Sequence, residues 1–206
     1  VAWACGLMTN QSDALAIRTL IENWGIYRDA RDWARFRTLW HADGMMMATW
    51  FQGNADTFIK VSQQGYDNGA RIWHAFAGHN VDVQGKRAIA QSKMTITQRG
   101  MVENVLCDVI CTGRFYTFLE KRRGKWGLVL LQPIYERDRI DPVDPSAKLK
   151  LNKTLLGGFP VGYRHLAYLQ TRAGFTVKKD MPGLDGPELS ALYRKGERWL
   201  AGKKLA

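Results

Sequence analysis

Apolar positions near the start of the chain recur every three or four residues, which is the spacing of one face of an amphipathic helix. A first set comprises Leu15, Ile17, Leu20, Ile21, Trp24 and Tyr27, and a second set comprises Trp33, Phe36, Leu39 and Trp40. Two carboxylates, Asp29 and Asp32, lie where the two predicted helices meet. Asp32 directly precedes the second helix and is predicted to cap it. Asp29 lies near the end of the first helix, where a carboxylate opposes the helix dipole. It is therefore either a solvated residue or a functional one.

The pattern then changes from helical to extended. A short strand is predicted over residues 45–51, and Asn54 is predicted to cap a third helix over residues 55–66. From Arg71 the apolar period is two, and long strands are predicted from residue 71 to a turn at 84–86, and then over the three ranges 87–98, 102–120 and 125–139. Further turns are predicted at Arg99-Gly100 and Arg123-Gly124, and Gly113 is predicted to mark a bulge.

Helices followed by long consecutive strands predict an α+β fold in which a curved antiparallel sheet wraps around the N-terminal helices. Such a sheet leaves a cone-shaped cavity that suits a small molecule. We divide the chain into an arm over residues 1–12, a cone domain over 13–145 and a C-terminal extension over 146–206. Met8 resembles a natural start, so residues 1–7 are expected to be upstream sequence. The extension ends in a helix predicted from Pro187 to about Leu200.

Composition supports a packed globular protein, since 46% of the residues are hydrophobic and 8 Trp, 7 Tyr and 8 Phe are present. The net charge is +11, and its distribution is uneven. Residues 1–145 hold 18 basic against 15 acidic residues, and residues 146–206 hold 12 against 4, which gives +3 and +8. The basic residues are scattered and match no nucleic-acid motif, so we predict a solvated surface and neither a nucleic-acid nor a membrane partner.

The cysteines do not form a framework. Cys107 and Cys111 would lie on one face of a strand but ~13 Å apart, too far for a disulfide. No cysteine or histidine partners stand at zinc-ligand spacing, and no glycine-rich fingerprint is present, so no metal or cofactor is predicted. Free thiols fit a reducing compartment, and with no leader or apolar span apparent we expect a cytoplasmic protein.

Two histidines lie in the first long strand. His74 and His79 have opposite parity, so in a regular strand only one faces the cone, although a bulge near Gly78 would reverse this. A single histidine on a strand is more often a structural residue than a catalyst. If Asp29 accepts a hydrogen bond from one nitrogen of His74, it fixes the tautomer and raises the pKa, so that the other nitrogen can exchange a proton near neutral pH.

The order of elements, the string Asp29-Ala-Arg-Asp-Trp33 and the place of His74 resemble the SnoaL-like group of the nuclear-transport-factor-like superfamily, and within it the scytalone dehydratases. The resemblance covers about residues 13–144. It implies an Asp29–His74 pair and a homodimer or higher homo-oligomer. The family's second catalytic histidine falls near Thr97, its tyrosine before the aspartate is replaced by Arg28, and its serine and asparagine fall near Gly113 and Phe115. These departures argue against scytalone as the substrate.

We therefore expect a cofactor-independent lyase that dehydrates, or cleaves by a retro-aldol step, a small hydroxylated aromatic compound. Asp29, His74 and Tyr27 are the candidate catalytic residues. Trp50, Thr97, Phe115, Tyr163 and His165 are the candidate substrate-binding residues. The alternatives are an isomerase that uses the same pair and a binding module without chemistry.

The extension adds a compact segment that holds Tyr163 and His165 after Gly157-Gly158. Two interpretations remain open: it closes the mouth of the cone and supplies the proton donor that is missing at Thr97, or it straps a subunit interface.

Overall fold

The computed structural model describes residues 2–205, with side chains described from residue 11 onwards. A curved six-stranded sheet in the order β2-β1-β6-β5-β4-β3 forms its centre. The elements are α1 (Ala2–Asp29), α2 (Trp33–Thr38), β1 (Trp40–Met47), β2 (Gln52–Asn54), α3 (Ala55–Asp67), β3 (Arg71–Gln84), β4 (Arg87–Val102), β5 (Val105–Arg122), β6 (Lys125–Pro142), α4 (Lys153–Gly157), the 3-10 helix η1 (Val161–Tyr163), α5 (Arg164–Arg172) and α6 (Pro187–Leu200).

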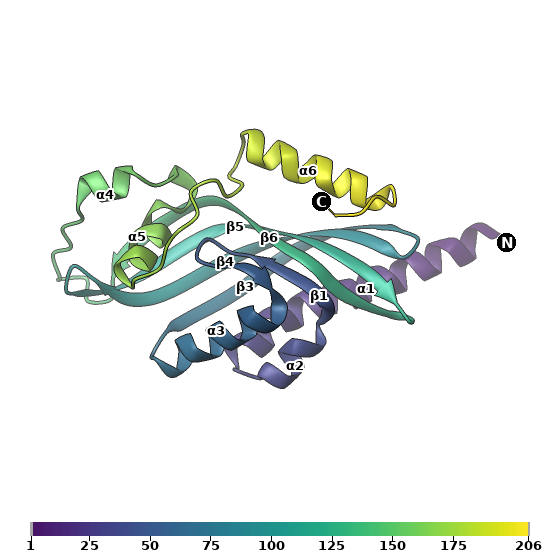
Figure 1. Ribbon diagram of the computed structural model, residues 1–206, viewed down its shortest axis with the longest axis horizontal. Helices are drawn as coiled ribbons and strands as arrows, with labels where there is room; N and C mark the ends of the chain where they lie inside the picture. The colour runs from purple at the N-terminus through teal and green to yellow at the C-terminus, as the bar shows by residue number, and fades with distance from the viewer. Residues whose placement is uncertain (1, 206) are drawn as a thin grey trace.

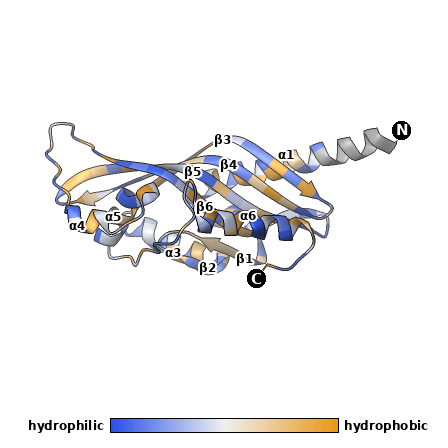
Figure 2. Ribbon diagram, turned by 90° about the horizontal axis from the view of Figure 1, so that it is seen from above, coloured by the Kyte–Doolittle hydropathy of each residue, from blue (hydrophilic) through white to orange (hydrophobic). Residues whose placement is uncertain are grey.

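Helices cover both faces of the sheet. α1, α2 and α3 lie on one face, which we call the inner face, and α6 lies on the other, the outer face (Figure 1). The main core lies between the sheet and the N-terminal helices, where Trp24, Phe36, Phe58 and Phe115 are fully buried. A smaller core joins α6 to the outer face through Leu189, Leu192 and Trp199. Figure 2 shows α6 lying over the sheet with hydrophilic and hydrophobic residues along its length.

The predicted fold class is confirmed, because a curved sheet wraps around the N-terminal helices and long neighbouring strands pair antiparallel. One pairing differs from the prediction. β1 runs parallel to β6, with Met45 opposite Leu130. Strands far apart in sequence meet here, and this pairing leaves no local signal in the sequence.

Side-chain caps begin the helices where the sequence predicts them. Asp32 accepts a hydrogen bond from the Arg35 backbone N–H at 3.1 Å, and Asn54 accepts one from Thr57 at 2.8 Å. Pro187 occupies the first turn of α6. Asp32 and Asn54 accept backbone N–H groups that the helix start leaves unpaired, and Pro187 has no N–H group to leave unpaired.

The predicted turn at Arg99-Gly100 is wrong. β4 continues to Val102, and the chain reverses at Glu103 and Asn104, which both have positive φ angles of 48° and 63°. Two such residues form a primed two-residue hairpin, whose twist matches that of the strands. Arg99 instead lies opposite Asp108 in β5 and makes two hydrogen bonds of 2.8 Å to its carboxylate.

Bulges and register shifts bend the sheet, and two of them lie at glycines. The register of β5 and β6 shifts at Gly113, where an added Cβ would lie 2.0 Å from the carbonyl oxygen of Ile134, so the predicted bulge is confirmed. β3 has a second bulge at Gly78, with φ of +67°. Beyond it His79 returns to the inner face, where its Nε2 lies 3.2 Å from Glu22 of α1.

The C-terminal extension packs into the main core. Tyr163, Leu166, Tyr168 and Leu169 of η1 and α5 are all buried in the cluster that holds Trp24. The helices α4 and α5 lie together at one end of the sheet (Figure 1). Among the described residues, none of the helices combines the length and the apolar character that crossing a bilayer requires.

Candidate active site

A carboxylate at the end of α1 holds a histidine of the edge strand β3. Asp29 Oδ1 lies 2.8 Å from His74 Nδ1, and Asp29 Oδ2 accepts the His74 backbone N–H at 2.6 Å. Because an ionised carboxylate only accepts hydrogen bonds, Nδ1 carries the ring proton and Nε2 holds the lone pair. No described residue hydrogen-bonds to Nε2. The geometry therefore orients a basic nitrogen.

His74 lines a narrow cavity between the inner face and the N-terminal helices. The free volume is about 30 Å³, enough for one or two water molecules. Mostly apolar and aromatic side chains from α1, α3 and the sheet form its walls, together with a few polar ones: Trp24, Arg28, Met46, Ala48, Trp50, Phe58, Ile72, His74, Ile96, Gln98, Phe115, Pro133 and Tyr135. A cavity with a few convergent polar groups is the usual form of a small-molecule site.

Burial decides the protonation of His74. Its side chain is 4% exposed, and burial lowers its pKa below the ordinary value. The hydrogen bond that His74 donates to Asp29 raises the pKa, and the nearby charge of Arg28 lowers it further. Asp29 raises the pKa of His74, as predicted, but the net pKa is lowered because desolvation outweighs the hydrogen bond. His74 is neutral at neutral pH and is ready to act as a base.

Arg28 is a buried cation that lines the His74 cavity. The sequence marks it only as a departure from the family pattern. Its side chain is 3% exposed, and burial lowers its pKa. The guanidinium carbon lies 5.6–5.7 Å from the ring centroids of Trp24, Phe58 and Tyr66. Nη1 reaches the Tyr66 hydroxyl at 3.5 Å, and Nε has no partner among the described residues. No sequence pattern marks this burial, since it arises from helix and sheet contacts.

A second cavity of about 40 Å³ adjoins the first and shares Arg28, Trp50, Ile72 and Gln98 with it. The extension forms its outer wall through Gln170 of α5 and Phe175, whose ring lies 5.3 Å from that of Trp50.

Gln170 is also part of a polar chain that joins the extension to the cone. It accepts the Thr49 hydroxyl at 2.7 Å and donates to Gln98 at 3.4 Å. The extension thus covers the second cavity, but with residues other than those predicted for this role.

The structure brings some of the predicted site residues to the cavity and leaves others outside. Trp50 and Phe115 line it. Tyr27 does not, because residues two apart on a helix point in different directions; its ring lies 5.7 Å from the Arg35 guanidinium. Thr97 lies opposite Trp73 on the outer face, and its neighbour Gln98 takes the cavity position.

The two predicted residues of the extension also lie elsewhere. Tyr163 is buried behind Tyr135, and its hydroxyl donates to the Lys178 carbonyl at 2.9 Å. His165 pairs with Asp138 of β6, with an Nδ1–Oδ1 distance of 2.8 Å. Neither residue lines the His74 cavity, so neither replaces the proton donor absent at Thr97.

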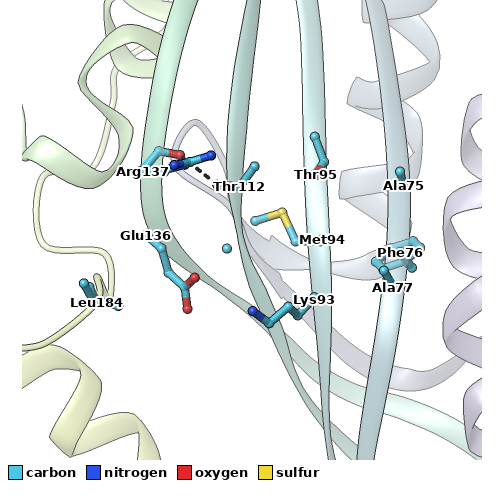
Figure 3. Close-up of a pocket in the computed structure, with 11 residues that line it drawn as sticks. Ala75, Phe76, Ala77, Lys93, Met94, Thr95, Thr112, Glu136, Arg137 and Leu184 are labelled. Atoms are coloured by element: carbon cyan, nitrogen blue, oxygen red, sulfur yellow. Dashed lines mark hydrogen bonds between the residues drawn. The ribbon is translucent and has the colours of Figure 1, made fainter.

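A larger hollow of about 610 Å³ lies on the outer face and is open to solvent. Lys93 and Glu136 extend over it from two strands, and small side chains such as Ala75 and Thr95 form its floor (Figure 3). Glu136 is bound by Arg114 at 2.6 Å. The hollow has no histidine and no orphaned buried donor among its lining residues, so we assign the chemistry to the smaller inner cavity.

Comparisons with known proteins identify the family of the chain. Residues 10–131 match the SnoaL-like domain family. Two proteins of Fusarium vanettenii, a PEP2-like protein and pea pathogenicity protein 2, are both 36% identical to the chain over 94% of its length and 88% of theirs. An uncharacterised protein of Emericella nidulans is 35% identical over 92% of the chain and 86% of its own length.

Solved structures share the fold at low identity. A protein from Novosphingobium aromaticivorans that carries the provisional name scytalone dehydratase has a TM-score of 0.56 and 17% identity, over 70% of this chain and 99% of its own. A hexachlorocyclohexane dehydrochlorinase has a TM-score of 0.53 and 11% identity, over 71% of this chain and 98% of its own. The fold is nuclear-transport-factor-like, as predicted, and the chain belongs to the SnoaL-like family.

Proposed function

We propose that the chain is a cofactor-independent lyase that acts on a small hydroxylated aromatic compound, with His74 as the proton shuttle and Asp29 as the residue that positions it. One observation carries the proposal: Asp29 Oδ1 lies 2.8 Å from His74 Nδ1, which leaves Nε2 as the available base of a histidine that lines an aromatic cavity. The names of two fold neighbours describe the elimination of water and of hydrogen chloride, which is compatible with a lyase.

In a dehydration, Nε2 removes a proton from the carbon next to a carbonyl group. The electron pair of that C–H bond forms a C=C bond, the C–O bond to the hydroxyl group breaks, and the imidazolium returns the proton so that water leaves. In a retro-aldol cleavage, Nε2 takes the hydroxyl proton instead. A C=O bond then forms, the C–C bond breaks, and the departing carbanion receives the proton.

The free volume of the cavities limits these reactions to an opened form of the site. A cavity known to bind benzene measures about 150 Å³, whereas the two inner cavities measure about 30 and 40 Å³. An aromatic substrate therefore needs Trp50 and Phe175, which lie between the cavities and the surface, to move apart.

The test is a screen of aromatic β-hydroxy ketones, followed by mass spectrometry for loss of water or of a small aldehyde. Asp29→Asn and His74→Gln should each lower kcat by about 10²- to 10⁴-fold, the usual contribution of a general base. Asp138→Asn serves as a matched control, because Asp138 holds His165 with the same contacts away from the cavity.

Other outcomes favour the alternatives. Exchange of a substrate hydrogen with solvent without elimination would identify an isomerase with the same pair. Tight binding without any exchange would identify a binding module. The expectations of a homo-oligomer and of a cytoplasmic location stay predictions.

A further inference from the structure

The buried guanidinium of Arg28 has a charge partner in Asp29 but lacks part of the hydrogen bonding that such a group needs. A buried cation is costly unless it is paired and hydrogen-bonded. Its nearest carboxylate oxygen, Asp29 Oδ1, is 3.9 Å away and is already engaged by His74. The Tyr66 hydroxyl at 3.5 Å is a weak contact, since that hydroxyl itself donates to the Ile72 carbonyl at 2.7 Å. The Nε–H of Arg28 therefore remains unsatisfied.

Orphaned polar atoms gather around the same two cavities. Among the described residues, five buried side-chain N or O atoms lack a hydrogen-bond partner. Three of them belong to cavity-lining residues: Trp24 Nε1, Arg28 Nε and Ser62 Oγ. Each unsatisfied buried group costs about 1–3 kcal/mol. Two of the three are N–H donors that cannot accept, so the group that satisfies them must carry an acceptor such as the oxygen atom of a ligand or of a water molecule.

The summed charge of Asp29, Arg28, His74 and the ligand indicates whether the ligand is neutral or anionic when it binds. With His74 neutral, Asp29 and Arg28 cancel, so a neutral ligand leaves the site balanced. After a proton passes from ligand to His74, the new imidazolium and the ligand anion also cancel. A ligand that is anionic from the start would leave one excess negative charge. The balance favours a neutral ligand that ionises inside the site.

We propose that Arg28 holds the oxyanion that forms when His74 removes a proton, and that the ligand is accordingly an enolisable carbonyl compound or a phenol. In this step the C–H or O–H bond of the ligand breaks, the proton goes to His74 Nε2, and the electron pair ends on the ligand oxygen. The oxygen accepts the hydrogen bond of Arg28 Nε–H. The inference rests on the proposed function and specifies its substrate class.

The first test uses 4-nitrophenol, whose phenolate form has its own visible absorption band. The wild-type chain should bind it as phenolate and so raise the phenolate fraction at a pH below the solution pKa of the probe. Arg28→Gln should weaken phenolate binding by about 10- to 100-fold, the range for hydrogen bonds to charged groups. Arg28→Lys, which keeps the charge, should retain part of it.

Arg31→Gln is the matched control, because it also removes one positive charge and lies three residues after Arg28. The Arg31 guanidinium lies against the Tyr66 ring, and Arg31 lines neither cavity. Equal phenolate binding by wild-type and Arg28→Gln chains that both fold by circular dichroism would overturn the proposal. Binding of nitrobenzene as tightly as 4-nitrophenol would also overturn it.

A second measurement needs no variant and no opening of the cavity. Formate, a small oxyanion that fits the free space, should shift the NMR signal of Arg28 Nε–H, whereas neutral formamide should shift it far less. Binding should tighten as the pH falls, since protonation of His74 restores the charge balance. Absence of a formate shift at any pH would refute the inference. Arg28-dependent anion binding in a chain without turnover would instead refute only the lyase.

Discussion

His165 and Asp138 make the same two contacts as His74 and Asp29. The Nδ1–Oδ1 distance is 2.8 Å and the backbone N–H donates to Oδ2 at 2.6 Å in both pairs. Asp138 also accepts the Leu166 N–H at 2.8 Å, in the first turn of α5. It therefore caps a helix, where a carboxylate is favoured. Asp29 instead lies at the end of a helix and beside a cavity, which suits a site better than a cap.

Asp29→Asn should lower the pKa of His74 further. The hydrogen bond and charge of Asp29 raise this pKa against the effects of burial and of Arg28, so their loss leaves the lowering influences unopposed. NMR titration of the His74 ring measures the change. Asp138→Asn should leave the His74 titration as in the wild type. A rise of the His74 pKa in Asp29→Asn would show that the pair does not form in solution.

Stability should fall as the pH is lowered through the His74 range. The pKa of His74 is depressed in the folded state, so below about 6.5, its unfolded value, the unfolded chain binds more protons and is favoured. His74→Gln should flatten the slope of the free energy of unfolding between about pH 5 and 7. Part of the slope should remain, because burial also lowers the pKa of His79. Urea unfolding at several pH values measures it, and equal slopes would contradict the assignment.

Phe175→Ala should open the cavities to solvent. Phe175 is 42% exposed and packs on Trp50 over the second cavity, so its removal should speed the association of 4-nitrophenol with little loss of stability. Stopped-flow tryptophan fluorescence can follow binding. Leu184→Ala is the control, since Leu184 is 66% exposed and lies at the outer hollow. An unchanged association rate in Phe175→Ala would place the access route elsewhere.

Gly113→Ala should destabilise the sheet by roughly 1–3 kcal/mol, the usual cost of overpacking. A Cβ there would lie 2.0 Å from a backbone carbonyl oxygen, which cannot rotate away as a side chain can. Gly157→Ala, which adds a Cβ with no atom within 4 Å, should change stability by no more than about 0.5 kcal/mol. Chemical denaturation compares the two. Similar effects of both substitutions would show that the position opposite the β6 bulge tolerates a side chain.

The sequence predicts the elements whose causes are local. The caps Asp32 and Asn54, the start of α6 at Pro187 and the bulge at Gly113 each depend on a few neighbouring residues. The sequence also places Asp29 at the end of a helix, and the resemblance pairs it with His74. The sequence does not reveal the turn at Glu103, because the residue that most resembles a turn position, Gly100, lies inside strand β4.

Features that depend on distant contacts could not be read in this way. The parity of Thr97 and Gln98 follows from the register of the sheet, and a one-residue uncertainty exchanges the two faces. The sign of the His74 pKa shift follows from burial, which the pair alone does not reveal. Gln170 and Phe175 reach the cavity only because the extension folds back over the cone.

Arg28 and Asp29 are consecutive residues in the last turn of α1. A rotation or translation of this turn would therefore displace the guanidinium and the carboxylate together, because one rigid helical turn holds both. Packing changes along the described part of α1, from Gln11 onwards, would shift both charged side chains without replacing either residue. Variation in the relatives of this chain should then tune base strength and anion affinity jointly, and separate adjustment of the two would require changes in β3.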